Sequence, residues 1–80
     1  MRNKNNNNES FGAALRALRK TAGKSQETLA WDAGLDRTYI SMLELGQRSP
    51  TLDTMLALCA ALGVSFLELA TEIDRRLAAP

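Results

Sequence analysis

Four glycines divide the chain into short segments in which apolar residues recur at intervals of three or four positions. That spacing is typical of one face of an α-helix, and glycine commonly ends a helix. Residue types that cap helix starts stand where the next segment begins. The glycines are Gly23, Gly34, Gly46 and Gly63, and the capping residues are Ser25, Asp36, Thr51 and Ser65. Because the chain has no cluster of β-branched residues and no hairpin dipeptide such as Asn-Gly, we predict an all-α domain of five short helices.

The folding unit is predicted to be residues 11–78, preceded by a disordered, asparagine-rich tail at residues 1–10. These first ten residues include five asparagines and no large apolar residue after Met1, so they bury too little surface to offset the entropy of ordering them. A domain of this size buries only about 60% of the surface that its unfolded chain exposes. The single cysteine, Cys59, excludes an internal disulfide, so we expect oligomerisation to supply the missing burial.

The composition also argues against several functional classes. The chain has no histidine, which disfavours a zinc site of His and Cys, so no metal and no cofactor is expected. No apolar run approaches the ~20 residues of a membrane span, and a lone thiol is typical of a reducing, cytoplasmic setting. A glycine-rich phosphate loop and a nucleophile elbow are also absent from the sequence. We therefore expect a cytoplasmic protein that is not an enzyme.

Charge is distributed unevenly along the chain. Residues 1–50 carry eight Lys or Arg and five Asp or Glu, a net charge of +3, whereas residues 51–80 carry two and four, a net charge of −2. A basic first part is compatible with a surface that faces phosphate, with the acidic part facing something else. Taken alone, this asymmetry favours an ordinary solvated surface, so the functional prediction depends on the motifs.

Residues 26–45 have the steric pattern of a helix-turn-helix. Small residues, Ala30 and Ala33, stand where two helices must approach closely, and Gly34 can adopt the positive φ that a tight turn requires. Branched apolar residues follow at Leu35 and Ile40, where the second helix of the pair packs onto the first. This arrangement predicts two short helices joined at Gly34, a unit that commonly binds DNA through its second helix.

Several separate motifs resemble the lambda-repressor/Cro-type helix-turn-helix family, also called the XRE family. They occur in order over about residues 11–70: Leu-Arg-x-Leu-Arg at 15–19, Ser-Gln-Glu at 25–27, Gly34, Tyr-Ile-Ser at 39–41, Glu44, Gly46, Pro50 and Ala-Leu-Gly-Val at 61–64. The segment Leu-Asp-Arg-Thr-Tyr-Ile-Ser at 35–41 is similar to controller proteins of restriction–modification systems. The resemblance implies a five-helix lambda-repressor-like fold that binds DNA.

The resemblance implies a DNA-contacting role for eight polar residues. They are Gln26, Arg37, Thr38, Tyr39, Ser41, Gln47, Arg48 and Ser49. Arg37 is expected to bind guanine O6 and N7, Thr38 a thymine methyl or a phosphate, and Gln26 and residues 47–49 the sugar-phosphate backbone. Two interpretations of Tyr39 stay open, because its ring either packs on the DNA backbone, with the hydroxyl on a phosphate, or covers the edge of the core.

Other residues are expected to serve folding and assembly. The resemblance implies a structural ion pair between Arg19 and Glu44 that joins the first and third helices. The fourth helix is predicted to face inward through Leu52, Met55, Leu56, Cys59 and Leu62, and one face of the fifth is lined by Phe66, Ala70, Ile73 and Leu77. The candidates for a dimer surface on these helices are Leu58, Leu67, Leu69 and Leu77.

We predict a sequence-specific transcriptional regulator that binds a partly palindromic operator as a homodimer. One recognition helix contacts only a few base pairs, whereas two-fold symmetry places two such helices ~34 Å apart on one face of the DNA. A controller of a restriction–modification operon is the favoured subtype. A phage-type repressor, an antitoxin and a protein-interaction module that keeps the fold without reading DNA are the alternatives. Because the chain shows no appended sensing domain, no small-molecule effector is expected.

Overall fold

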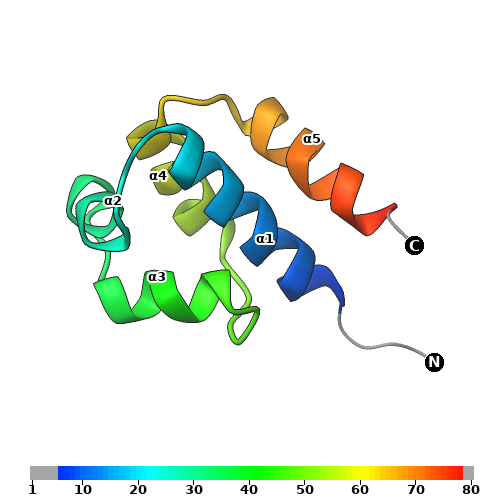
Figure 1. The fold of residues 1–80 in the computed structure, drawn as a ribbon, viewed down its shortest axis with the longest axis horizontal. Helices are drawn as coiled ribbons and strands as arrows, with labels where there is room; N and C mark the ends of the chain where they lie inside the picture. Colours follow the sequence, from blue (N-terminus) through cyan, green and yellow to red (C-terminus); the bar gives the residue numbers. More distant parts are fainter. Residues whose placement is uncertain (1–5, 79–80) are drawn as a thin grey trace.

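The computed structural model describes residues 6–78, and this range forms five helices. They are α1 (Asn6–Thr21), α2 (Gln26–Ala33), α3 (Arg37–Glu44), α4 (Leu52–Leu62) and α5 (Phe66–Leu77). Helix α1 runs through the middle of the domain and packs mainly against α5 on one side and α3 on the other (Figure 1). Helix α2 packs against α3 and α4. The prediction of an all-α, five-helix fold is confirmed.

Hydrogen bonds from side chains fix the starts of three helices. The hydroxyls of Ser25, Thr51 and Ser65 each accept a backbone N–H from three residues later. Ser65 also takes part in a capping box, because its own N–H donates to Glu68 Oε1 at 2.8 Å. Asp36 occupies the cap position of α3 but makes no side-chain capping bond there. Local sequence therefore sets where α2, α4 and α5 begin, whereas α3 depends on packing.

The predicted end of the tail lies too far along the chain, because α1 begins at Asn6 and not after residue 10. The first turns of α1 pack against the rest of the domain. Ser10 is only 8% exposed, and a Cβ built on Gly46 would lie 3.0 Å from Glu9 Cγ. Contact with the loop after α3 thus orders residues whose composition alone predicts disorder. The remainder of the predicted tail, residues 1–5, lies outside the described residues.

The core lies where the five helices meet. Its buried members are Phe11, Leu15, Leu29, Ala30, Ile40, Leu43, Leu58, Cys59, Leu62 and Leu69. Leu58 and Leu69, predicted as dimer-surface residues, are each 1% exposed and therefore belong to the core of one chain. In contrast, Leu52 and Leu56, predicted to face inward, are 56% and 46% exposed. On α4 the prediction is confirmed for Met55, Cys59 and Leu62, which lie in or against the core, and is wrong for Leu52, Leu56 and Leu58.

Gly12 allows α1 and α3 to approach closely. A Cβ built at this position would lie against the carbonyl oxygen of Leu43 and 2.6 Å from that of Glu44. Both oxygens belong to backbone, which cannot move aside as the end of a flexible side chain can. Gly12 therefore sets the distance between α1 and the C-terminal end of α3.

Within residues 6–78, no single helix is long and apolar enough to cross a membrane. Helices α4 and α5 reach that length and apolar content only when taken together, and they are bent by 108° relative to each other. The same residues contain no group of three or more His, Cys, Asp or Glu side chains that could hold a metal ion.

Candidate nucleic-acid interface

Helices α2 and α3 form a tight helix-turn-helix. Gly34 ends α2 with φ 70°, and its N–H donates to the carbonyl of Trp31 at 3.2 Å. The N–H of Leu35 donates to the carbonyl of Ala30 at 2.8 Å, so the turn closes within a few residues. Ala30 is 3% exposed and Ile40 is fully buried. The small side chain lets α3 lie directly against α2, as the residue pattern predicted.

One face of α3 is polar and open to solvent. Arg37 and Thr38 are exposed and Ser41 is half-buried, whereas Ile40 and Leu43 on the other side are fully buried. Within residues 6–78, no hydrogen bond or ion pair engages the side chains of Arg37, Thr38 or Ser41. We call these three residues the recognition face. A rigid helix with an unengaged arginine, threonine and serine can offer hydrogen-bond donors and acceptors to base edges.

A buried ionic cluster holds three helices around Glu44. Arg19 Nε donates to Glu44 Oε2 at 2.6 Å and Arg19 Nη2 to Glu44 Oε1 at 3.0 Å, which makes the pair bidentate. The two side chains are 11% and 4% exposed. Hydrogen bonding to Glu44 raises the pKa of Arg19 above its ordinary value, although burial acts in the opposite direction. The ion pair implied by the resemblance is therefore present, and it joins α1 to α3.

Gln26 belongs to this cluster, which the sequence did not indicate. Its Nε2 donates to Glu44 Oε1 at 2.9 Å, so the start of α2 is tied to the end of α3. The side chain predicted to meet a phosphate thus has its amide nitrogen turned toward Glu44. The second N–H of this amide and the backbone N–H groups at the start of α2 are the donors left for a phosphate contact.

Lys24 is a second structural residue that the sequence did not reveal. Its Nζ donates to Asp32 Oδ2 at 2.7 Å and to the carbonyl of Ala61 at 2.6 Å. Since Ala61 lies 37 positions along the chain, no local spacing could have indicated the contact. Lys24 thus ties the loop after α1 to α2 and α4.

The loop after α3 presents the remaining predicted contact residues. Gly46 has φ 76°, its N–H donates to the carbonyl of Leu43 at 3.1 Å, and the N–H of Gln47 donates to the carbonyl of Met42 at 2.9 Å. These two bonds form a Schellman motif. Beyond it, residues 47–49 are exposed. The backbone geometry thus directs this polar loop outward beside α3.

Tyr39 and Arg48 come together across this loop. The guanidinium carbon of Arg48 lies 5.5 Å from the centroid of the Tyr39 ring. The ring is half-buried and also packs against the core. Of the two interpretations that the sequence left open for Tyr39, the one at the edge of the core describes the ring in the free protein.

Trp31 on α2 is 86% exposed, more than any other large apolar residue in the described range. An indole this exposed contributes little to the core. Leu45, just after α3, is also exposed, at 65%.

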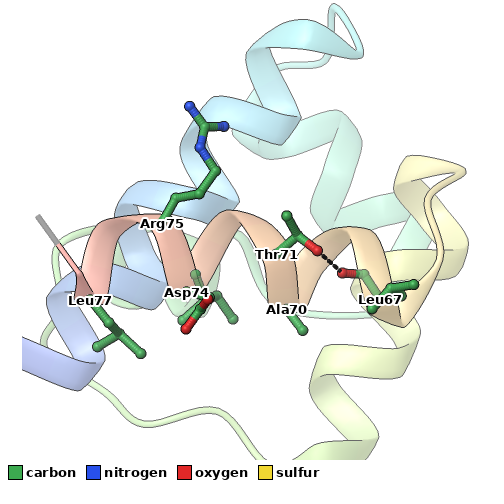
Figure 2. A pocket seen from close by; sticks show the side chains of 7 residues that line it. Leu67, Ala70, Thr71, Asp74, Arg75 and Leu77 are labelled. Atoms are coloured by element: carbon green, nitrogen blue, oxygen red, sulfur yellow. Dashed lines mark hydrogen bonds between the residues drawn. The ribbon is translucent and has the colours of Figure 1, made fainter.

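The other exposed apolar residues gather on the last two helices. They are Leu52 and Leu56 on α4 and Phe66, Leu67 and Leu77 on α5. An open hollow runs along α5 and is lined by residues that include Leu67, Ala70, Ile73 and Leu77. Figure 2 shows Ala70 and Leu77 pointing to one side of the helix and Arg75 to the other. Two of the four predicted dimer-surface residues, Leu67 and Leu77, thus lie on an exposed apolar face.

Comparisons with known proteins agree with this geometry. The helix-turn-helix family pattern matches residues 15–69. The chain is 41% identical over 63 residues to an uncharacterized HTH-type transcriptional regulator of Sinorhizobium fredii, covering 79% of this chain and 82% of the relative. It is 39% identical over 66 residues to the control protein C.MunI of a Mycoplasma species, covering 81% and 89%.

A solved structure shows the same fold. The restriction–modification controller protein C.AhdI from Aeromonas hydrophila superimposes with a TM-score of 0.75 at 47% sequence identity, covering 78% of this chain and 94% of that one. The matched helix-turn-helix pattern covers more than half of the chain and includes the recognition face and the Arg19–Glu44 pair. The chain therefore belongs to the XRE-type helix-turn-helix family of transcriptional regulators.

Proposed function

We propose that this DNA-binding regulator acts as a homodimer on a partly palindromic operator, as a controller of a restriction–modification operon. The observation that carries the proposal is the recognition face. Arg37, Thr38 and Ser41 have no side-chain hydrogen bond within residues 6–78, yet the helix that bears them is held to α1 and α2 through Glu44. A rigid helix with free polar groups suits a protein that reads base edges with little reorganisation.

Arg37 is the residue from which we expect the strongest base contact. It is the first residue of α3, and the N-terminal residues of a recognition helix are those that reach base edges in the major groove. Its planar guanidinium can donate two parallel hydrogen bonds to guanine O6 and N7. Thr38 and Ser41 flank it and would contact neighbouring bases or phosphates, while residues 47–49 would contact the backbone beside the groove.

The exposed apolar residues of α4 and α5 support a dimer. Five of the seven large apolar residues that are exposed in the described range lie on these two helices, and contiguous apolar patches on a protein surface commonly mark interaction sites. Helix α5 packs on the opposite side of α1 from α3 (Figure 1). A second copy bound there would leave both recognition faces free, and a two-fold interface pairs the same patch on each subunit.

The controller subtype is supported by the relatives, since C.MunI and C.AhdI are both named as control or controller proteins. The gene of such a regulator commonly lies next to the operator that the protein binds. The test is a gel shift with purified protein on DNA from directly upstream of its gene and on an unrelated duplex of equal length. We expect a discrete complex on the upstream DNA that survives excess unrelated competitor. Equal, salt-sensitive binding to both duplexes would show that the protein has affinity for phosphates without a sequence preference.

Arg37→Ala is expected to weaken binding to the upstream DNA by about 10- to 100-fold, because a bidentate arginine–guanine contact contributes ~1–3 kcal/mol of discrimination. Binding to the unrelated duplex should weaken far less. Arg75→Ala changes the net charge equally but lies on α5 and pairs with Glu72, so it serves as the control and should keep the preference for upstream DNA. An equal loss in both variants would show that Arg37 contributes only charge.

Introducing charge on α5 is expected to dissociate the dimer. Leu67 and Leu77 are 74% and 47% exposed, so Leu67→Asp with Leu77→Asp should leave the monomer folded while placing unpaired carboxylates in the interface. At protein concentrations on the order of tens of micromolar, analytical ultracentrifugation should show a dimer for the wild type and a monomer for the variant. Leu45→Asp, at an exposed leucine outside α4 and α5, should remain dimeric. A monomeric wild type would contradict the proposal.

A further inference from the structure

We propose that Tyr39 is a positioning residue whose ring holds the guanidinium of Arg48 in place to bind a DNA phosphate. The inference rests on the proposed function and deepens it, because it assigns the ring of Tyr39 a role that acts through Arg48. The observation is the 5.5 Å separation between the guanidinium carbon and the ring centroid. This separation lies within the range in which an arginine interacts favourably with an aromatic face.

The ring is a fixed platform. Tyr39 lies on α3 between the recognition face and the buried side of the helix, and its ring packs against the core. The next residue, Ile40, is fully buried, so α3 has little freedom to rotate at this point. The Glu44 cluster holds the other end of the same helix. The aromatic face therefore keeps one orientation relative to the recognition face.

The backbone beneath Arg48 is also fixed. The Schellman bonds of Gly46 and Gln47 determine the path of the chain as it leaves α3. Gly46 further contacts the first turn of α1, where a Cβ would lie 3.1 Å from Glu9 Cα. The side chain of Arg48 extends from this fixed backbone and is exposed. Within residues 6–78, Arg48 takes part in no hydrogen bond or ion pair, so the ring of Tyr39 is its described partner.

Stacking and phosphate binding use different parts of the guanidinium. The guanidinium carbon lies over the ring, and an arginine on an aromatic face still has N–H groups available for phosphate oxygens. A free arginine side chain loses rotamer freedom when it binds, and an arginine already held in place loses less. Removing the ring should therefore weaken the phosphate contact of Arg48 even though no atom of Arg48 changes.

The competing explanation is that Tyr39 contacts the DNA directly through its hydroxyl. The two explanations differ in which part of the side chain matters, and Tyr39→Phe separates them because it removes only the hydroxyl. Tyr39→Leu removes the aromatic face but keeps an apolar side chain at the edge of the core. Arg48→Ala removes the phosphate contact, and the Tyr39→Leu/Arg48→Ala double variant shows whether the two residues act together.

The experiment measures affinity for a mixed-sequence duplex over a series of salt concentrations by fluorescence anisotropy. Arg48→Ala should lower the slope of log affinity against log salt by about one phosphate contact. Tyr39→Leu should lower the slope in the same direction and weaken binding by about two- to five-fold, whereas Tyr39→Phe should keep the wild-type slope and lose less affinity than Tyr39→Leu. In the Arg48→Ala background, Tyr39→Leu should have little further effect.

Additive losses in the double variant would overturn the proposal, as would a loss in Tyr39→Phe equal to that in Tyr39→Leu. Thermal unfolding by circular dichroism checks that Tyr39→Leu remains folded. If Tyr39→Leu is unfolded, Arg48→Lys is measured in its place. Lysine keeps the positive charge at this exposed position but lacks the planar guanidinium group. We then expect a two- to five-fold loss of affinity, and wild-type affinity would overturn the proposal. A wild type that binds no duplex would overturn the proposed function itself, an outcome distinct from normal binding with additive variants.

Discussion

Glu44→Ala is expected to lower the free energy of unfolding by about 3–5 kcal/mol, because it leaves the guanidinium of Arg19 charged and without its partner in a nearly buried position. Arg19 is 11% exposed at its side chain, and within residues 6–78 its one other hydrogen-bond partner is the carbonyl of Lys24, at 2.8 Å. The same substitution removes the acceptor for Gln26. Because domains of this size have a total stability of roughly 5–15 kcal/mol, the loss is a large fraction of the whole.

Thermal unfolding followed by circular dichroism measures this effect. At roughly 4–8 °C per kcal/mol for a small domain, the melting temperature should fall by more than about 10 °C. Arg19→Met with Glu44→Leu removes both charges and fills the space with apolar groups, so it should lose much less than Glu44→Ala alone. Glu72→Ala breaks ion pairs with Arg75 and Arg76 on the surface of α5 and should have the smallest effect. A loss in Glu44→Ala no greater than in Glu72→Ala would contradict the structural role of the cluster.

Gly12→Ala is expected to destabilise the domain by about 1–3 kcal/mol, although alanine in a helix interior is ordinarily the more stable residue by about 1 kcal/mol. The physical reason is contact with backbone, since a Cβ at Gly12 would lie 2.6 Å from the carbonyl oxygen of Glu44. Relief requires α1 and α3 to separate. That separation would also lengthen the hydrogen bonds between Arg19 and Glu44.

Chemical denaturation of Gly12→Ala and Gly12→Val provides the measurement, and the loss should grow with the size of the side chain. Ala13→Val is the matched control, because Ala13 is adjacent in sequence but exposed. It should change stability by no more than the small difference in helix propensity. If Gly12→Ala proved more stable than the wild type, the close approach of α1 and α3 would not be needed for the fold.

Helix positions were predictable because the signals that set them are local. A hydroxyl that caps a helix start and a glycine that ends a helix act over three or four residues, so Ser25, Thr51 and Ser65 could be identified directly from the sequence. The beginning of α1 was missed for the converse reason. Residues 6–10 have a composition that predicts disorder, and their order depends on contact with Gly46, a residue far along the chain.

Periodicity alone could not predict which faces of α4 and α5 are buried in the core. Both helices carry apolar residues on more than one face, and an apolar stripe that packs in the core looks the same in sequence as one that is exposed for a partner. Leu58 and Leu69 were therefore assigned to the surface and Leu52 and Leu56 to the core, whereas the structure has the reverse. Only the packing of α4 and α5 in three dimensions separates the two sets.

In the candidate site, too, some features could be predicted from the sequence and others could not. The exposure of Arg37 and Thr38 followed from their place on a short amphipathic helix, with Ile40 and Leu43 facing inward. The bonds of Gln26 to Glu44, of Lys24 to Ala61 and of Arg48 to the Tyr39 ring join residues distant in sequence. No spacing rule connects such pairs, so the scaffold of the site became visible only in the fold.

The absence of side-chain hydrogen bonds from the recognition face within the described range has a practical consequence. Within that range no hydrogen bond of the core, the Glu44 cluster or α5 involves the side chains of Arg37, Thr38 and Ser41, so these three can be exchanged as a set while those parts stay unchanged. Transplanting the whole helix-turn-helix into another chain would instead separate Glu44 from Arg19 on α1. The DNA sequence preference of the domain should therefore be open to change by replacing these three side chains while the rest of the fold is kept.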